Sequence, residues 1–121
     1  MTRLLLAFVL LSGCASAQWT TADTIRQGAI VALQAADYFQ TRTIATETYS
    51  GTDCLRWTEQ NPILGEHPTV GQVNAFFITA IAANALVSYL LPPTWRMGWQ
   101  YISIGYEGNV VLDNYRAGIR W

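Results

Sequence analysis

The chain has 121 residues, of which 51% are hydrophobic and 12% are charged, about half the usual charged share. Its seven basic side chains are all arginines, and eight acidic residues offset them, so no dense basic surface for nucleic acid is present. One small domain with so few charges predicts a protein whose apolar surface is covered by a membrane or by a partner.

The first 17 residues have the pattern of an export signal. Arg3 precedes an apolar run at residues 4–11, and this run is too short to span a bilayer. The four residues that end at Cys14, in the order Leu-Ser-Gly-Cys, resemble the bacterial lipobox, whose cysteine is diacylated and becomes the mature N-terminus. We therefore expect a signal peptide over residues 1–13 and a lipid on Cys14.

A lipid on Cys14 predicts a location at the periplasmic face of the bacterial cell envelope. Ala15 and not Asp follows the cysteine, so the resemblance implies an outer-membrane lipoprotein with a lipidated linker over residues 14–20. An alternative overlaps this site, because the run Ala-Ser-Ala that ends at Ala17 is a cleavage signal that would release a secreted chain. In either case Cys54 is the one remaining cysteine, and we expect it in a buried loop.

The first predicted helix covers residues 21–46. A threonine at position 20 or 21 offers an N-cap, and Asp23 suits the positive end of the helix dipole. The helix is moderately apolar all round, which predicts that it packs closely between neighbours, and small and apolar residues recur at helical spacing on one face. These residues are Ile25, Gly28, Ala29, Ala32, Leu33 and Ala36.

Asp37 interrupts the apolar side of this helix. Thr41 lies one turn later, so a carboxylate and a hydroxyl share the same side. Two interpretations stay open: the pair is half of a polar site, or Asp37 is neutralised by an arginine or by a neighbouring helix end.

The segment from residue 47 to residue 68 shows no sustained period and is rich in Thr, Gly, Asp and Pro, which predicts a long ordered loop. It gathers Glu59, Asn61, Glu66 and His67 within nine residues. No ligand spacing typical of a metal site is present, so we expect no metal there. We expect Glu59 and Asn61 to form a structural corner by hydrogen bonds with helix ends.

The second predicted helix covers residues 69–91. Thr69 and Gln72 match a capping box, and two prolines end the helix. No acidic or basic residue occurs between His67 and Arg96, so the helix either enters a membrane or forms the central helix of a soluble bundle. Small and polar residues at four-residue spacing predict a close helix contact: Ala80, Asn84 and Ser88.

The third predicted helix covers residues 94–117, with Thr94 as its N-cap and Gly118 as the residue that ends it. Glu107 lies between apolar neighbours in this helix, and a buried carboxylate must find a partner or stay protonated. Arg42, Asn74 or Asn84 would serve as such a partner, and Asp37 of the first helix would be a partner that shares a proton with Glu107.

Together these elements predict an all-α fold, a small three-helix bundle over residues 21–121. The candidate polar site comprises Asp37, Thr41, Glu59, Asn61, His67 and Glu107. The sequence contains no phosphate-binding loop, nucleophile elbow or zinc signature, so we expect no enzymatic activity and no cofactor.

Three stretches of the chain resemble a family of small, uncharacterised helical proteins of phages and prophages in Gram-negative bacteria. They are ADYFQTR at residues 36–42, NPILGEHP at residues 61–68 and GWQYISIGYE at residues 98–107. The resemblance covers most of residues 22–121 and implies a viral or prophage origin. It transfers no catalytic residue, because the family carries no assigned activity.

Three functions are compatible with these features. The first is a lipid-anchored envelope protein that works by contact with a membrane or with an envelope protein, as in phage exclusion or support of lysis. The second is a structural protein whose copies assemble into a membrane-associated homo-oligomer. The third is a small proton-active membrane protein that uses Asp37 and Glu107.

Overall fold

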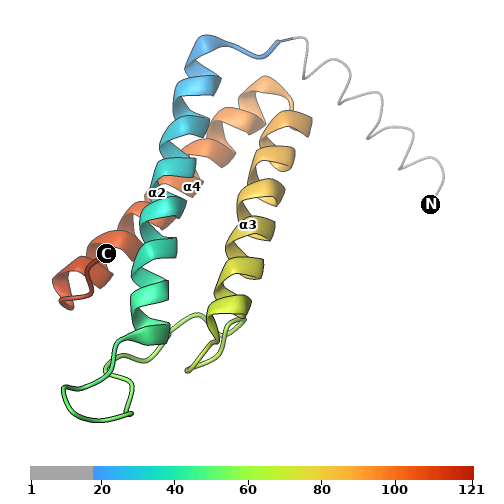
Figure 1. The fold of residues 1–121 in the computed structure, drawn as a ribbon. Helices are drawn as coiled ribbons and strands as arrows, with labels where there is room; N and C mark the ends of the chain where they lie inside the picture. The colour runs from blue at the N-terminus through green and yellow to red at the C-terminus, as the bar shows by residue number, and fades with distance from the viewer. Residues whose placement is uncertain (1–17) are drawn as a thin grey trace.

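The computed structural model describes residues 18–121 and has three helices joined by one long loop and one tight turn (Figure 1). Helix α2 covers Thr21–Thr46, α3 covers Val70–Leu90 and α4 covers Pro93–Arg116. These bounds confirm the predicted all-α three-helix bundle to within one residue. The export signal, the expected lipid site at Cys14 and the alternative cleavage site at Ala17 lie outside the described residues.

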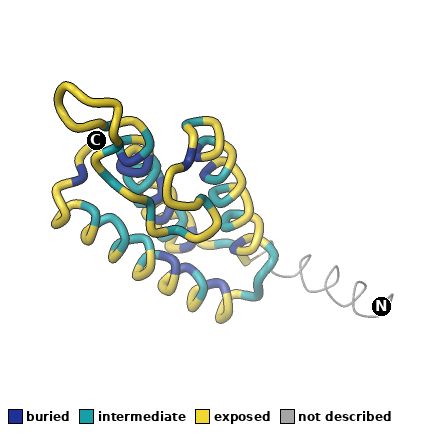
Figure 2. The backbone as a smooth tube through the Cα atoms, turned by 90° about the horizontal axis from the view of Figure 1, so that it is seen from below, coloured by how far each residue is buried: buried dark blue, intermediate teal, exposed yellow. Residues whose placement is uncertain are grey.

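Helix α2 packs against both other helices, whereas α3 and α4 contact each other much less. The long loop joins α2 to α3 at the lower end of Figure 1, and the turn at residues 91–92 joins α3 to α4 at the upper end. From this turn α4 runs back and crosses behind α2. Because α3 is covered mainly by α2, much of its length stays exposed (Figure 2).

The helix starts follow from their local sequences. Thr20 and Thr69 begin α2 and α3, each with the capping box that pairs the cap with its third following residue. Helix α4 begins differently from the prediction, because Pro92 is its N-cap and Thr94 lies inside the helix. Pro93 suits the first helical position, since its fixed φ is helical and it has no N–H to leave unpaired.

The interior of the bundle is unusually polar for a chain that is so hydrophobic. The fully or almost fully buried polar side chains are Asp23, Gln34, Gln40, Thr41, Ser88, Arg96, Gln100 and Ser103. Hydrogen bonds between helices satisfy many of these groups. Gln40 donates to the carbonyl of Val111 at 3.1 Å, and Asn84 of α3 joins Gln27 of α2 at 3.1 Å to Ser103 of α4 at 2.9 Å.

Helix α2 packs against both neighbours as predicted, but most of its small-residue face is exposed, and only Leu33 and Ala36 of that face are half-buried. Ile25 is 68% exposed, and Gly28, Ala29 and Ala32 are exposed as well. A Cβ atom added at Gly28 would meet no atom within 4 Å among the described residues. The buried side of α2 combines Ile30 and Ile44 with polar side chains. Gln27 and Gln40 of α2 hydrogen-bond to α3 and α4.

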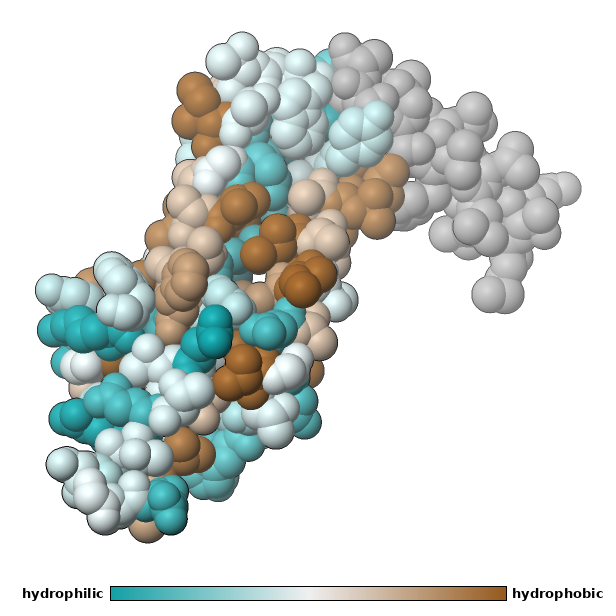
Figure 3. Space-filling model, in the orientation of Figure 1, coloured by the Kyte–Doolittle hydropathy of each residue, from teal (hydrophilic) through white to brown (hydrophobic). Residues whose placement is uncertain are grey.

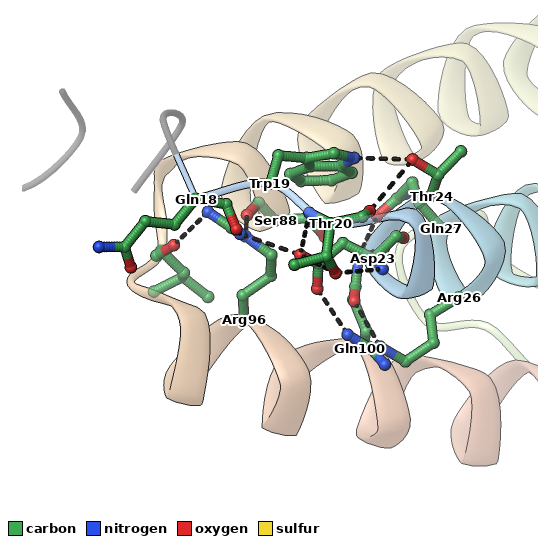
Figure 4. Close-up of polar contacts among 11 residues, drawn as sticks. Gln18, Trp19, Thr20, Asp23, Thr24, Arg26, Gln27, Ser88, Arg96 and Gln100 are labelled. Carbon is green, nitrogen blue, oxygen red and sulfur yellow. Dashed lines mark hydrogen bonds and ion pairs between the residues drawn. The ribbon is translucent and has the colours of Figure 1, made fainter. Parts of the chain in front are cut away.

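A buried charged cluster joins the start of α2, the end of α3 and the start of α4 (Figure 4). The guanidinium of Arg96, which is fully buried, lies 3.2 Å from Asp23 of α2. It also donates to the carbonyls of Ser88 at 2.9 Å and Leu91 at 3.0 Å, and the ring of Trp19 covers it at 4.8 Å. One arginine therefore connects all three helices.

Asp23 is ionised in this cluster. Burial alone would raise its pKa, but hydrogen bonds from Thr20, Arg26 and Arg96 outweigh burial and hold the pKa below its ordinary value. The stability that this carboxylate contributes is therefore present at neutral pH. It is lost as the pH falls through the lowered pKa, because the protonated form gives up these partners.

We expect Arg96→Met to lower the free energy of unfolding by about 3 kcal/mol or more, because Asp23 stays buried without its α4 cation and two carbonyls lose their donor. Chemical denaturation followed by circular dichroism measures the change. The matched control on the same helix is Arg116→Met, which removes an exposed contact to Asp113 at 3.8 Å and changes stability by less than about 1 kcal/mol. Equal losses in the two variants would contradict the role given to the cluster.

Candidate functional site

A cavity of about 600 Å³ lies between α2, the first half of α3, the second half of α4 and the long loop. Five of the six residues predicted for a polar site line it: Asp37, Thr41, Glu59, Asn61 and Glu107. The sixth, His67, is exposed and does not line the cavity. We call this space the acid cavity.

Asp37 enters the acid cavity from α2 and is held there by hydrogen bonds. Its Oδ1 accepts from the hydroxyl of Thr41 at 3.3 Å and from the amide of Asn114 at 3.3 Å. The Asn114 amide also donates to Gln40 at 3.2 Å, so α4 fixes two side chains of α2. No arginine within residues 18–121 forms an ion pair with Asp37, so neutralisation by an arginine is not found there.

Glu107 enters the cavity from α4, and Gln34 of α2 hydrogen-bonds its carboxylate. The other carboxylate oxygen of Glu107, Oε2, is buried and has no hydrogen-bond partner in the described part of the chain. The same holds for Glu59 Oε2 and for Gln34 Oε1, and Gln34 is only 3% exposed. Three buried acceptor oxygens therefore belong to residues that line one cavity.

The loop that closes the lower side of the cavity is ordered by its own hydrogen bonds. Glu59 accepts from the N–H of Asn61 at 2.7 Å, and Asn61 accepts from the N–H of Ile63 at 3.0 Å. The N–H of Glu59 donates to the carbonyl of Glu66 at 3.0 Å. The predicted structural corner is present, but it bonds within the loop and not to helix ends. Cys54, expected to be buried, is exposed in the same loop.

The surroundings of Asp37 favour its protonated form. Burial raises the pKa of Asp37 to about 7, with further increases from the charges of Glu107 and Glu59, while the Thr41 hydrogen bond acts in the opposite direction. Burial also raises the pKa of Glu107, against the hydrogen bond from Gln34. The charge of Glu107 thus acts on Asp37, as the hypothesis of a paired acid expects.

The rest of the wall is mainly apolar and aromatic. Its apolar and aromatic members include Ile44, Trp57, Leu64, Phe76, Phe77, Ala80, Tyr106 and Val110. Arg56 is the one basic residue among the described residues of the wall. Its guanidinium is already engaged, because it bonds Glu47 at 3.0 Å and lies 5.3 Å from the centre of a ring of Trp57.

Sequence reasoning missed Gln34 and Trp57 as cavity residues. Gln34 lies three residues before Asp37, which places both on one side of a helix, so this spacing was a signal. Trp57 gave no such signal, because a loop residue reaches a cavity only through tertiary contacts.

Within residues 18–121, no group of three or more His, Cys, Asp or Glu side chains is arranged to hold a metal ion. Comparison of the chain with protein-family models, with curated proteins and with solved structures found no match. The residues of this chain are therefore the basis for a proposed function, and the resemblance to phage and prophage proteins stays a proposal.

We expect Asp37→Asn to stabilise the protein at pH 8 and to change its stability little at pH 4. In the folded state Asp37 ionises only near pH 7, so its unfavourable contribution grows from about pH 4 to pH 7 and is constant above. The expected gain at pH 8 is about 2 to 4 kcal/mol, measured by chemical denaturation at both pH values. Asp53→Asn, which removes an exposed acid outside the cavity wall, is the control. An equal gain from Asp37→Asn at both pH values would refute the raised pKa.

Proposed function

We propose that this protein is a non-enzymatic lipoprotein of the bacterial cell envelope that works by contact, with one face of α3 lying in the hydrocarbon of a lipid bilayer. We define the α3 face by its exposed apolar residues, which are Ala75, Ile78, Ala82, Ala83, Leu86, Val87 and Tyr89. Ala75, Ile78, Ala82, Leu86 and Tyr89 recur at steps of three and four residues, and Ala83 and Val87 lie beside them, so together they cover one broad side of the helix.

The observation that carries the proposal is an uncharged apolar helix left uncovered. By length and composition, α3 is the one helix among the described residues that is able to cross a membrane, and only 22% of its most apolar window is buried. Ile78 is 71% exposed and Leu86 is 57% exposed. Soluble monomers rarely leave such a surface open to water, so a membrane or a protein must cover it.

The distribution of polar residues supports a one-sided contact. Figure 3 shows hydrophobic residues gathered over the upper and middle parts of α2 and α3, and hydrophilic residues concentrated toward the long loop and the C-terminal end. No acidic or basic residue lies in α3, so its face carries no charge that a bilayer would have to accommodate.

The start of the described chain lies beside the α3 face. The rings of Trp19 and Tyr89 are 6.4 Å apart, so residue 19 sits at the C-terminal end of α3. Cys14 precedes Trp19 by five residues, and an extended chain of that length reaches about 17 Å. A lipid on Cys14 would hold this end of α3 at the membrane. A lipid and an apolar face together supply the two signals that stable anchoring takes.

The proposed location follows from the residue after the expected lipid site. Ala15 after Cys14 favours the periplasmic face of the outer membrane, and release after Ala17 as a secreted protein is the alternative. A role as an accessory protein of a phage or prophage, in exclusion or in support of lysis, rests on the resemblance of the three sequence stretches alone.

A vesicle flotation experiment tests the membrane contact. We expect residues 18–121, the form that cleavage at Ala17 would release, to float with phospholipid vesicles. The double variant Ile78→Lys and Leu86→Lys should bind about tenfold more weakly or worse, because lysine is costly in hydrocarbon. The matched control is Ile102→Lys on α4, where the isoleucine is 70% exposed, and it should float like the unchanged chain.

Two other outcomes would overturn this arrangement. If the Ile102→Lys control also stops floating, the whole bundle is embedded and not one face. If the unchanged chain does not float but sediments as a dimer that the double variant dissociates, the α3 face binds a second copy and the protein is the homo-oligomer of the alternative proposal.

Mass spectrometry of the mature protein tests the lipid anchor. We expect the chain to begin at a diacylated Cys14, and we expect Cys14→Ala to shift the mature N-terminus to Gln18 through the overlapping cleavage site. An unmodified N-terminus at Gln18 in the unchanged protein would exclude the lipoprotein and leave the secreted form.

A further inference from the structure

The acid cavity gathers negative groups and lacks a free cation in the described part of the chain. Asp37, Glu59 and Glu107 line it, and Glu59 and Glu107 each have a buried carboxylate oxygen without a hydrogen-bond partner there. Arg56, the one basic residue of the wall within residues 18–121, is bonded to Glu47. Buried acceptors of this kind are stable only when a donor or a proton reaches them.

The amide oxygen of Gln34 is a further observation, because it is an acceptor that carries no charge. Its side chain is almost fully buried, at 3% exposed, and lines the cavity, yet its Oε1 has no partner within residues 18–121. An unpaired buried amide oxygen costs about 1 to 3 kcal/mol. A third unpaired acceptor on the same wall therefore points to a ligand that donates several hydrogen bonds.

The shape of the site favours an organic cation over a metal ion. No three ligand side chains in residues 18–121 come together in the way a metal needs. The acceptors are instead spread around walls that carry Trp57, Phe76 and Phe77. A guanidinium group offers five N–H donors in one plane, is weakly hydrated and packs well on aromatic rings.

We propose that the acid cavity binds a guanidinium or primary ammonium group carried on an apolar stem. The charged group would lie among Asp37, Glu107 and Gln34, and the stem would lie against Phe76 and Phe77. A volume of about 600 Å³ is within the usual range of small-molecule sites. Such a group belongs either to a free small molecule or to an arginine or lysine side chain of a partner.

Protons compete with this ligand. The charged or titratable groups around Asp37 are Arg56 and Glu59 from the loop and Tyr106, Glu107 and Asp113 from α4, while α3 contributes only Phe76, Phe77 and Ala80 to the wall. Acidification neutralises Asp37, whose pKa is about 7. The cation is therefore expected to bind above that pH and to be released below it.

Titration of the full chain in a nonionic detergent with n-butylguanidinium and with n-butylammonium tests the proposal. At pH 8 we expect saturable binding by isothermal titration calorimetry. The neutral analogue n-butanol should bind at least tenfold more weakly, and both cations should bind at least tenfold more weakly at pH 5. Absence of saturable cation binding at pH 8, or equal binding of n-butanol, would overturn the proposal.

Variants locate the binding. Asp37→Asn with Glu107→Gln should weaken cation binding at least tenfold, and Gln34→Leu should weaken it severalfold. The control Glu66→Gln removes an exposed acid that is not part of the wall and should leave the affinity unchanged. Circular dichroism checks that each variant is folded. Unchanged affinity in the folded double variant would also overturn the proposal.

A second titration separates the two sources of the ligand. N-acetylarginine amide presents the same guanidinium with the backbone groups of a protein side chain. If it binds as well as n-butylguanidinium, the cavity accepts a partner's arginine. If only the alkyl cation binds, the site is built for a free small molecule.

Discussion

The arrangement of the three helices depends on Arg96. Its guanidinium bonds the Asp23 carboxylate at the start of α2 and the carbonyls of Ser88 and Leu91 at the end of α3, and it is itself part of α4. Carbonyls at a helix end have no partner within the helix, so a buried donor has to come from elsewhere in the fold. A single side chain thereby fixes which helix ends meet and holds the α3–α4 turn against α2.

The polar interior has a consequence for the exterior. Because glutamine, serine and threonine side chains occupy much of the contact between helices, many of the large apolar residues lie on the outside of the bundle. The number of exposed apolar residues does not by itself indicate a membrane contact, since folded proteins always expose some apolar surface. Helix α4 exposes more of them than α3 does, but α4 also carries acidic and basic residues, whereas the apolar helix α3 carries none. The proposed membrane contact rests on this uncharged and largely uncovered helix.

Two aspartates of the same helix show how the partners of a carboxyl group decide its chemistry. Asp23 and Asp37 are both substantially buried on α2. Asp23 faces Arg96 and Arg26, and its pKa lies below the ordinary value, whereas Asp37 faces Glu107 and Glu59 and its pKa is about 7. The first position stabilises the fold as an ion pair. The second leaves an acceptor-rich cavity that protons or an organic cation would neutralise.

The sequence by itself determined the three helices, because hydrophobic spacing, the caps at Thr20 and Thr69 and the double proline are local signals. It also singled out Asp37 and Glu107, since acids in apolar surroundings stand out along a chain. Only the tertiary structure decided which side of α2 is buried, that His67 lies away from the cavity, and that Arg96 pairs with Asp23. These facts depend on contacts between residues far apart in sequence, 73 positions in the case of that pair, and no local pattern encodes them.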